Sequence, residues 1–519
     1  MNIDLAKRIL QGLYSQGVCD FCLCPGSRNA PLIAVLEHAR NIRLHFFFDE
    51  RSAAFFALGR IARDSAPVAV VTTSGTAVAE LLPAAVEAHY RALPLVLLTA
   101  DRPARFRNSG APQSIEQVGI FSHYVAQSLD LTSESPDLNF ALPRGPVHIN
   151  VRFDEPLLDH HINLFNFDEV RPFTLPEAEA PDEDKVRLSI TQFCQRVRSP
   201  VILLCDMKQA LREATTVALK NSRVPIYAES LSGLRESGWP THLLGGERIF
   251  KFANFDGVIR IGGVPTARFW RDLEKSQTPV LHIADESWPG LTRGQVFSGM
   301  TAHLALRFLR EELTDPPPNE NLYLTDEKMK RRLEDLLLQE SASEPGLLGA
   351  LSHRIAIGSR VYLGNSLPIR EWDLAATRES RAFSFSANRG ANGIDGQLST
   401  FFGWCHPHQE NWAIIGDLTA LYDLNSPWIL SRELHDTPLR IVIINNSGGQ
   451  IFSRLYTSPS FVNAHNLDFS AWAKMWDLSY LRWERIPQKW DLAPRQVIEL
   501  RPDPASTERF WRCYEDLTT

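Results

Sequence analysis

The sequence is poor in cysteine and has no long apolar run. Its seven cysteines are few and odd in number for 519 residues, so we expect no framework of disulfide bonds. No stretch reaches the ~18 to 20 consecutive apolar residues of a membrane-spanning helix, and no apolar signal segment follows the charged start. The formal net charge of -7 disfavours non-specific binding to nucleic acid. These absences favour a cytoplasmic enzyme, and they still allow an anionic substrate because basic residues can gather in one pocket.

Nucleotide-binding motifs and a paired zinc motif are also missing. The chain has neither Gly-x-Gly-x-x-Gly after a predicted strand nor the Gly-x4-Gly-Lys-Ser/Thr loop, which counts against a nucleotide-binding protein. Cys19, Cys22 and Cys24 cluster, but a structural zinc site usually needs two such clusters and no second Cys-x-x-Cys occurs. Because the three cysteines lie in an apolar run, we interpret them as small buried side chains of a strand.

Short apolar runs alternate with helical stretches, which predicts parallel sheets covered by helices on both faces. The length suggests about three globular domains, and the content of 44% hydrophobic and 22% charged residues is typical of such proteins. Residues 172–184, rich in proline and acid, and Asp315–Asn319, with three consecutive prolines, are predicted linkers. We therefore predict an α/β protein with three doubly wound parallel-sheet domains, at residues 1–172, 185–314 and 320–519.

The first predicted domain begins with a helix that Asn2 or Asp4 can cap and that Gly17 can end. A strand follows up to Cys24, and a further helix is predicted over residues 77–89. The other predicted strands are 68–71, 95–98 and 147–151 in the first domain, 201–204, 226–227, 258–261 and 280–283 in the second, and 361–363, 412–415, 441–444 and 497–500 in the third.

Two strand ends in the third domain carry residues typical of a metal-diphosphate site. Gly416-Asp417 follows one predicted strand and Asn445-Asn446 follows another. In open parallel sheets, ligands bind beyond the carboxyl ends of the strands. Carboxylate, amide and backbone carbonyl oxygens suit Mg²⁺, and glycines let the backbone approach a diphosphate. Each dipeptide is common in ordinary turns, but the spacing of 29 positions from Asp417 to Asn446 resembles the pattern of thiamine-diphosphate enzymes.

Glu50 is the candidate for a distant second contact with that cofactor. In the superfamily that the spacing resembles, a glutamate of the first α/β domain, usually from a partner subunit, contacts the aminopyrimidine ring. Three phenylalanines, Phe46 to Phe48, lie just before Asp49 and Glu50 in the sequence. An apolar setting of this kind would raise the pKa of the Glu50 carboxyl group. The ordinary alternative is an acidic residue in the first turn of a helix. The pattern in the third domain favours the cofactor role.

A longer series of motifs resembles one family of this superfamily. The series is Pro25-Gly-Ser-Arg28, Phe48-Asp-Glu-Arg51, Thr73-Ser-Gly-Thr76, Thr99-Ala-Asp-Arg-Pro103, Gly364-Asn-Ser-Leu367, Asn388-Arg-Gly-Ala391, Gly393-Ile-Asp-Gly396, Gly416 to Asn425, and Gly448-Gly-Gln-Ile-Phe-Ser453. It resembles the 2-succinyl-5-enolpyruvyl-6-hydroxy-3-cyclohexene-1-carboxylate synthases, which are transferases (carboligases) of menaquinone or phylloquinone biosynthesis. The resemblance covers residues 2–500 and is thin in the middle domain.

The resemblance implies a reaction, cofactors and an assembly. Members of the family decarboxylate 2-oxoglutarate and add the succinyl unit to isochorismate, using thiamine diphosphate and Mg²⁺, with Mn²⁺ as an alternative. They are homodimers or homotetramers whose subunits share active sites. By this resemblance, Asp417, Asn446 and the Gly448 carbonyl bind the metal, and Ile394 supports the bent cofactor. Other implied cofactor contacts are Gly416, Leu418, Thr419, Gly449, Gln450 and Ile451. Implied substrate contacts are Ser27, Arg28, Arg102, Gln113, Arg268, Ser366, Arg370, Arg389, Ile451, Phe452 and Leu455.

Both implied substrates are dicarboxylates, and guanidinium groups bind carboxylates in a bidentate manner. The ordinary role of a single arginine is a surface salt bridge. Arg28, Arg370 and Arg389 are better candidates because each is predicted in a Gly/Ser/Asn-rich turn after a strand.

Two residues depart from the family pattern. Pro112 stands where asparagine is common, and proline offers neither a side-chain amide nor a backbone N–H. Arg268 replaces a lysine, which keeps the charge and changes its geometry.

His406 and His408 could suggest a metal or acid–base pair, but they are predicted in a loop without a third ligand nearby.

The alternative functions are another thiamine-diphosphate enzyme of 2-oxoacids, such as a decarboxylase or acetohydroxyacid synthase, and a non-catalytic α/β scaffold.

Overall fold

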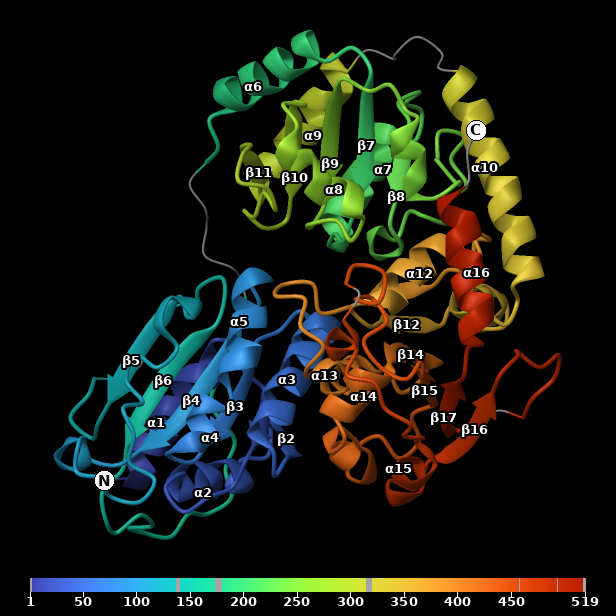
Figure 1. Cartoon of the computed structure of the whole chain (residues 1–519). Helices are drawn as coiled ribbons and strands as arrows, with labels where there is room; N and C mark the ends of the chain where they lie inside the picture. Colours follow the sequence, from blue (N-terminus) through green and yellow to red (C-terminus); the bar gives the residue numbers. More distant parts are fainter. Residues whose placement is uncertain are drawn as a thin grey trace. The chain divides into compact units, whose positions relative to one another are not determined.

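The computed structural model describes residues 2–136, 141–171, 173, 180–313, 320–456, 458–491 and 493–516 (Figure 1). The chain forms two compact units. The first contains residues 1–177, 388–408 and 419–437, and the second contains residues 178–387, 409–418 and 438–519. Part of the predicted linker at residues 172–184 and all of the one at Asp315–Asn319 lie outside the described residues. The three predicted domain boundaries stay a prediction.

The first unit is built on a six-stranded parallel sheet with the order β2-β1-β3-β4-β6-β5. The helices α1 and α2 cover one face, where Ile9, Leu13 and Leu36 share a core with Phe21 and Val71. On the other face α3 packs against β3, and α13 lies along α3. The strands are β1 (Asp20–Leu23), β2 (Arg43–Phe46), β3 (Val68–Thr72), β4 (Leu95–Asp101), β5 (Gln127–Leu131) and β6 (Val147–Arg152). The helices are α1 (Asn2–Ser15), α2 (Ala30–His38), α3 (Glu50–Asp64), α4 (Thr76–Ala79), α5 (Leu82–Tyr90) and α13 (Gln397–Trp404).

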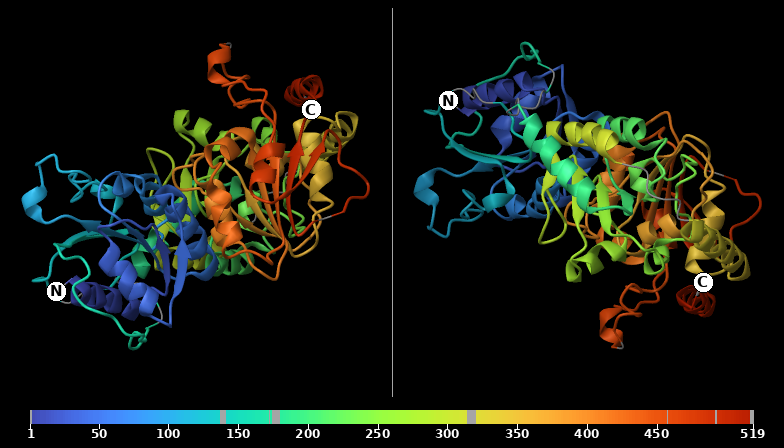
Figure 2. Two further views of the ribbon diagram at one scale, coloured as in Figure 1. Left: turned by 90° about the horizontal axis from the view of Figure 1, so that it is seen from below. Right: turned by 90° about the horizontal axis from the view of Figure 1, so that it is seen from above.

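The second unit contains two parallel sheets. The five-stranded sheet has the order β11-β10-β9-β7-β8. Its strands are β7 (Pro200–Leu204), β8 (Ile226–Ala228), β9 (Gly257–Ile261), β10 (Val280–Ala284) and β11 (Val296–Ser298). The helices α6 (Glu183–Arg196), α7 (Gln209–Leu219) and α9 (Met300–Glu312) share the core on one face, and α6 and α9 lie side by side (Figure 2). The helices α8 (Arg268–Asp272) and α10 (Glu320–Gln339) pack on the other face, so this sheet is covered on both sides.

The other sheet of the second unit has six parallel strands in the order β13-β12-β14-β15-β17-β16. Its strands are β12 (Arg360–Leu363), β13 (Ser384–Ser386), β14 (Asn411–Gly416), β15 (Leu439–Ile444), β16 (Ser479–Trp483) and β17 (Arg495–Leu500). The helices α11 (Glu344–Ser352) and α12 (Leu367–Ala375) share a core with the apolar residues of one face. The remaining helices of this unit are α15 (Ser470–Met475) and α16 (Pro504–Glu515), and α14 (Asp417–Tyr422) begins in this unit and continues into residues 419–437 of the first.

Buried polar contacts join the two sheets of the second unit. The guanidinium group of Arg235, which lies beyond β8, donates hydrogen bonds to the carbonyls of Ala376 (2.7 Å) and Thr377 (2.8 Å) after α12. Asp373 on α12 accepts a hydrogen bond of 2.7 Å from the Ser230 N–H. Because unpaired charge is costly in the interior, these bonds hold the end of α12 against the loops of the five-stranded sheet.

The structure confirms the α/β prediction, with three parallel sheets, and it corrects one predicted helix. Residues 77–89 form two helices, α4 and α5, because Pro83 has no backbone N–H with which to continue the first helix and instead occupies the first turn of the second. The predicted burial of Cys22 and Cys24 is confirmed, but Cys19 is half-buried and precedes β1. No helix in the described ranges is long and apolar enough to cross a membrane.

Candidate active site

The two polar strand ends of the third predicted domain meet at one sheet edge. β14 and β15 are adjacent and parallel, and Gly416 pairs with Ile444. Asp417 and Asn445 therefore leave the sheet side by side, as their spacing predicts. Figure 1 shows α14 beginning where β14 ends.

Asp417 is buried at this edge, and its carboxylate is already oriented by its neighbours. One oxygen accepts a hydrogen bond of 2.9 Å from the Gly448 N–H. The same oxygen lies 3.2 Å from Nε2 of His465. Nδ1 of His465 accepts a hydrogen bond of 3.2 Å from the Leu467 N–H, which fixes the orientation of the ring. Burial raises the pKa of Asp417, against the opposing effect of the Gly448 N–H and His465.

Asn446 presents an oxygen that is ready for a ligand. Its Nδ2 donates a hydrogen bond of 2.9 Å to Glu344, whereas its Oδ1 is buried and has no hydrogen-bond partner in the described part of the chain. Buried polar atoms are nearly always paired, so an unpaired oxygen marks a position for an absent partner. Asn445 differs, because its amide is bonded to the Leu467 carbonyl and to Glu499 and serves the fold.

The glycines beside Asp417 and Asn446 allow the backbone to approach closely. Gly448 has a φ of 135°, and a Cβ there would lie 2.5 Å from the Val462 carbonyl oxygen. A Cβ at Gly416 would have nothing within 4 Å, so the space beside this residue is open. The unpaired Asn446 oxygen, the Asp417 carboxylate and the open space at Gly416 fit a divalent cation and its diphosphate.

The partner of Asn446, Glu344, belongs to a pair of buried acids. Glu344 begins α11 and Glu371 lies on α12, and each is almost wholly inaccessible. Burial raises the pKa of both carboxyl groups, and the contact between them raises that of Glu371 further. A pair of carboxyl groups in contact can share a proton and thereby avoid two buried charges.

Glu50 is the first residue of α3 in the first unit, and hydrogen bonds fix the start of this helix. The preceding Asp49 caps the helix by accepting a hydrogen bond of 3.2 Å from the Ser52 N–H, and Asn425 donates a second hydrogen bond to Asp49. Burial raises the pKa of Glu50, and the nearby carboxylates of Asp49 and Glu80 add to this rise. A raised pKa favours the protonated carboxyl group.

The three phenylalanines before Glu50 contribute less to its raised pKa than the sequence predicts. Phe47 is buried, but Phe48 is 53% exposed and packs edge-on against Trp428, with 4.9 Å between ring centroids. β2 ends at Phe46, and the burial of the three residues varies, with Phe46 half-buried, Phe47 buried and Phe48 exposed. The raised pKa of Glu50 therefore comes from its own burial and the neighbouring acids.

Among the predicted substrate residues of the first unit, Ser27 and Arg28 follow β1 and Arg102 and Gln113 follow β4, whereas Arg389 comes after β13 of the second unit. Arg28 is buried, and its Nη1 donates to the Phe153 carbonyl (3.2 Å) and lies 3.3 Å from Glu155. Arg102 donates from Nε to the Pro112 carbonyl, at 3.1 Å. The departure at Pro112 thus keeps a polar contact through its carbonyl oxygen. Ser27 and Gln113 are exposed, and Arg389 and Ile394 are half-buried.

The segment that carries Arg389 is held by a buried glutamate. Glu87 on α5 accepts hydrogen bonds from the Gly390 N–H (2.8 Å) and the Ala391 N–H (2.7 Å). A Cβ at Gly390 would lie 2.6 Å from the Glu87 carbonyl oxygen, so glycine is required for this approach. Two bonds to one carboxylate give the turn after Arg389 a defined place.

Two of the predicted substrate residues of the second unit, Arg268 and Arg370, lie near Glu247. The positive charges of Arg370 and Arg268 act to lower the pKa of Glu247, although burial outweighs them and raises it. The prediction that Arg370 lies in a turn is wrong. It lies on α12, because Pro368 in the first turn and Ser366 before the helix favour a helix start earlier in the chain. Arg268 begins α8 and is exposed, as are Phe452 and Leu455.

The predictions miss Glu344, Glu371, His465 and Arg454. Arg454 is ion-paired with Glu515 on α16, and its guanidinium carbon lies 4.5 Å from the centre of the Trp511 ring. Glu371 has one local signal, since it falls on the apolar face of α12 beside Pro368, Trp372 and Ala375. The other three have none, because their contacts are made with distant segments.

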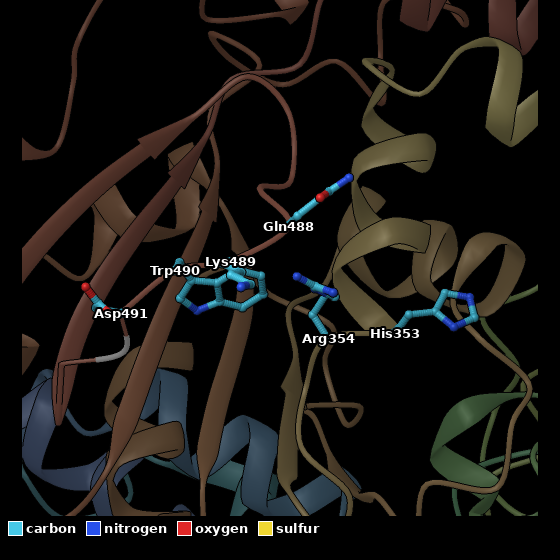
Figure 3. Close-up of a pocket in the computed structure, with 6 residues that line it drawn as sticks. All are labelled: His353, Arg354, Gln488, Lys489, Trp490 and Asp491. Atoms are coloured by element: carbon cyan, nitrogen blue, oxygen red, sulfur yellow. The ribbon is translucent and has the colours of Figure 1, made fainter.

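A hollow of about 640 Å³ in the second unit is not this site. It is lined by His353, Arg354, Gln488, Lys489, Trp490 and Asp491 (Figure 3). None of the predicted cofactor, metal or substrate residues lines it. His406 and His408 lie in a loop, as predicted, and this loop belongs to the first unit.

Known proteins resemble this chain over nearly its whole length. A protein of Bdellovibrio bacteriovorus named 2-succinyl-5-enolpyruvyl-6-hydroxy-3-cyclohexene-1-carboxylate synthase is 43% identical over 531 residues, which cover 99% of each chain. Proteins of the same name from Akkermansia muciniphila and Bacillus velezensis are 37% and 31% identical, over 98% and 96% of this chain and 97% and 94% of their own. Residues 3–120 match the family described as thiamine pyrophosphate enzyme, N-terminal TPP binding domain. The chain therefore belongs to the family of 2-succinyl-5-enolpyruvyl-6-hydroxy-3-cyclohexene-1-carboxylate synthases, which are thiamine-diphosphate-dependent enzymes.

Proposed function

We propose that this chain decarboxylates 2-oxoglutarate and adds the succinyl unit to isochorismate, in the biosynthesis of menaquinone or phylloquinone. The observation that carries the proposal is the 43% identity to a synthase of this name over 99% of both chains. Bound thiamine diphosphate supplies the electron sink that decarboxylation of a 2-oxo acid requires. The domains that hold it are residues 1–172, which bind the pyrimidine, and 320–519, which bind the diphosphate, with 185–314 between them.

The metal site of the proposal consists of Asp417, Asn446 and the Gly448 carbonyl, with Mg²⁺ as the ion and Mn²⁺ as a substitute. The unpaired Oδ1 of Asn446 supports this assignment, as does the orientation of the Asp417 carboxylate by the Gly448 N–H. Hard oxygen ligands of this kind suit both ions. The other proposed cofactor contacts are Gly416, Leu418, Thr419, Gly449, Gln450 and Ile451, with Ile394 as the apolar support.

Glu50 is the proposed catalytic acid. Its raised pKa favours a protonated carboxyl group, which can donate to a nitrogen of the cofactor's pyrimidine ring and take the proton back. The cap that Asp49 provides and the bond from Asn425 keep the start of α3 in place, so the carboxyl group needs little reorganisation.

Arginines supply the positive charge that two dicarboxylate substrates need. The first unit contributes Arg28, Arg102 and Arg389, and the second contributes Arg268 and Arg370. The remaining proposed substrate contacts are Ser27, Gln113, Ser366, Ile451, Phe452 and Leu455. We propose that the protein acts in the cytoplasm as a homodimer or homotetramer whose subunits share active sites.

A direct assay separates this activity from its relatives. The purified protein is incubated with 2-oxoglutarate, with and without thiamine diphosphate, Mg²⁺ and isochorismate, and CO₂ release is measured. We expect release that depends on the cofactor and the metal, with the coupled product formed only when isochorismate is present. Release from pyruvate but not from 2-oxoglutarate would instead assign another thiamine-diphosphate activity.

Substitution of Glu50 by glutamine tests the catalytic acid. We expect Glu50→Gln to lower the rate of CO₂ release by about 100-fold or more, because general acid–base groups contribute about 10²–10⁴-fold. The unfolding temperature should stay near that of the unmodified protein. Glu37→Gln, at an exposed glutamate of the same unit, is the control and should keep full activity. A rate for Glu50→Gln within a few-fold of the parent would refute the assignment.

A further inference from the structure

The amide of Asn446 is held in one of two possible orientations by Glu344. The two ends of an asparagine amide have the same shape, and only hydrogen bonding decides which end is the oxygen. Glu344 Oε2 lies 2.9 Å from Nδ2 of Asn446 and accepts its hydrogen bond. This bond turns Nδ2 toward Glu344 and leaves Oδ1, which has no partner in the described residues, on the other side.

Glu344 is itself fixed by the fold. Its side chain is 2% exposed at the start of α11, where Ser343 caps the helix and Pro345 occupies the first turn. Its own backbone N–H donates to Thr507 at 3.1 Å. Glu371, which is wholly buried on α12, lies beside it. A carboxyl group so enclosed cannot turn away from Asn446 to reach water.

We propose that Glu344 is a positioning residue of the cation site, which holds the amide of Asn446 so that its oxygen, and not its nitrogen, is presented to the divalent cation. Without this hydrogen bond the amide can rotate, and its NH₂ group then repels a cation. Groups behind the direct ligands commonly set metal affinity by about 10- to 100-fold. The inference rests on the proposed metal site at Asp417 and Asn446.

The neighbouring pair of Asn445 and Glu499 offers a matched control at the same edge of the sheet. Glu499 is also wholly buried, and one of its oxygens accepts a hydrogen bond of 2.9 Å from the amide of Asn445. Glu344 and Glu499 thus hold consecutive asparagines, but only Asn446 has an unpaired amide oxygen. A change at Glu499 should disturb the fold without altering the cation site.

The test measures cation affinity and needs no turnover. Binding of Mn²⁺ in the presence of thiamine diphosphate is followed by electron paramagnetic resonance, and that of Mg²⁺ by quenching of tryptophan fluorescence. We expect Glu344→Leu to raise the apparent Kd of both ions by about 10-fold or more. Glu344→Gln should stay within about three-fold, because the glutamine oxygen can still accept from Asn446. Glu499→Gln should keep the parent's Kd while lowering the unfolding temperature.

A second variant keeps the test decisive if Glu344→Leu does not fold. Glu344→Met keeps the length of the side chain and removes the acceptor, so we expect the same rise in the apparent Kd. Unchanged affinity in Glu344→Leu or in Glu344→Met would overturn the positioning role. Asp417→Ala separates this failure from that of the metal site, because unchanged cation binding in that variant would place the ion elsewhere.

Discussion

Ser366 precedes α12 with a φ of 74° and a ψ of -128°, a conformation that L-residues rarely adopt. Such a backbone costs a non-glycine residue about 1–3 kcal/mol. The strain stands in a turn where the sequence predicts contact with substrate. Glycine would adopt this φ without strain, so the presence of serine indicates that its hydroxyl group is needed here.

Ser366→Gly separates these two properties. We expect the free energy of unfolding to rise by about 1 kcal/mol. Glycine removes the backbone strain from the folded protein, but it also increases the conformational entropy of the unfolded chain, which offsets part of this stabilisation. The KM for substrate should rise at the same time if the hydroxyl binds it. Urea denaturation and steady-state kinetics measure the two effects. Ser380→Gly, at an exposed serine outside the left-handed region, is the control, and equal stability changes in both variants would refute the strain.

At the scale of single residues, local motifs predicted some of the site and missed the rest. Asp417 and Asn446 follow apolar strands with a recognisable spacing, and the structure brings them to one edge. Glu344 has no such local pattern, because its Ser-Glu-Pro context is typical of an exposed helix start. Its hydrogen bond with Asn446 joins residues that are 102 positions apart. A contact of that separation has no periodicity to reveal it.

Among the elements, central strands were easier to predict than edge strands. Every predicted strand is present, and the strands that the pattern missed, β2, β5, β11, β13 and β16, each lie at the edge of a sheet. A central strand of a parallel sheet is buried on both faces and is apolar throughout. An edge strand is partly exposed, as the mixed burial of β5 shows, so its sequence loses the continuous apolar run.

The helices α3 and α13 cross at a pair of glycines. A Cβ at Gly59 would lie 2.0 Å from the Thr400 carbonyl oxygen, and one at Gly403 would lie 2.1 Å from that of Phe56. The two backbones are therefore in direct contact, and neither position accepts a side chain without moving a helix. This contact ties residues 388–408 to the first unit.

Gly59→Ala tests the helix crossing. We expect a loss of about 1–3 kcal/mol in the free energy of unfolding, because the added methyl group meets backbone atoms that cannot yield. The measurement is chemical denaturation, with the fluorescence of the tryptophans as the signal. Ala62→Ser adds one atom at a half-buried site of the same helix and should change stability by less than about 0.5 kcal/mol. A Gly59→Ala protein as stable as the parent would contradict the close contact.

The stability of the whole molecule depends on pH through a buried cluster in the first unit. His45 on β2 is buried, with Nε2 at 2.8 Å from Asp20 and Nδ1 bonded to Glu433. Arg60 on α3 also donates to Asp20, at 2.8 Å. Burial acts to lower the pKa of His45, but the two carboxylates outweigh it and the pKa is raised. Burial acts to raise the pKa of Asp20, but His45 and the two arginines Arg43 and Arg60 lower it well below its usual range.

The direction of the pH effect follows from the sign of each shift. A raised pKa of His45 stabilises the folded protein below the unfolded value of about 6.5, and this stabilisation is lost as pH rises through the folded pKa. His45→Gln should therefore cost more stability at about pH 5.5 than at about pH 8.5. Denaturation at both pH values measures the difference.

His148 provides a control with the opposite sign. Burial lowers the pKa of His148 to about 4, so its neutral form is favoured in the fold and its contribution is lost as pH falls. His148→Gln should cost more at high pH than at low pH. An equal cost of His45→Gln at both pH values would show that the cluster does not hold a proton.

The sequence by itself determined the α/β class, the central strands and the cofactor motif, because each is written in residues close together along the chain. Only the tertiary structure decided which acid faces Asn446, that Arg370 lies on a helix, and that Glu87 holds the segment after Arg389. These contacts join segments far apart in sequence. Burial and hydrogen bonding between such segments depend on how the elements pack, and no local pattern carries that information.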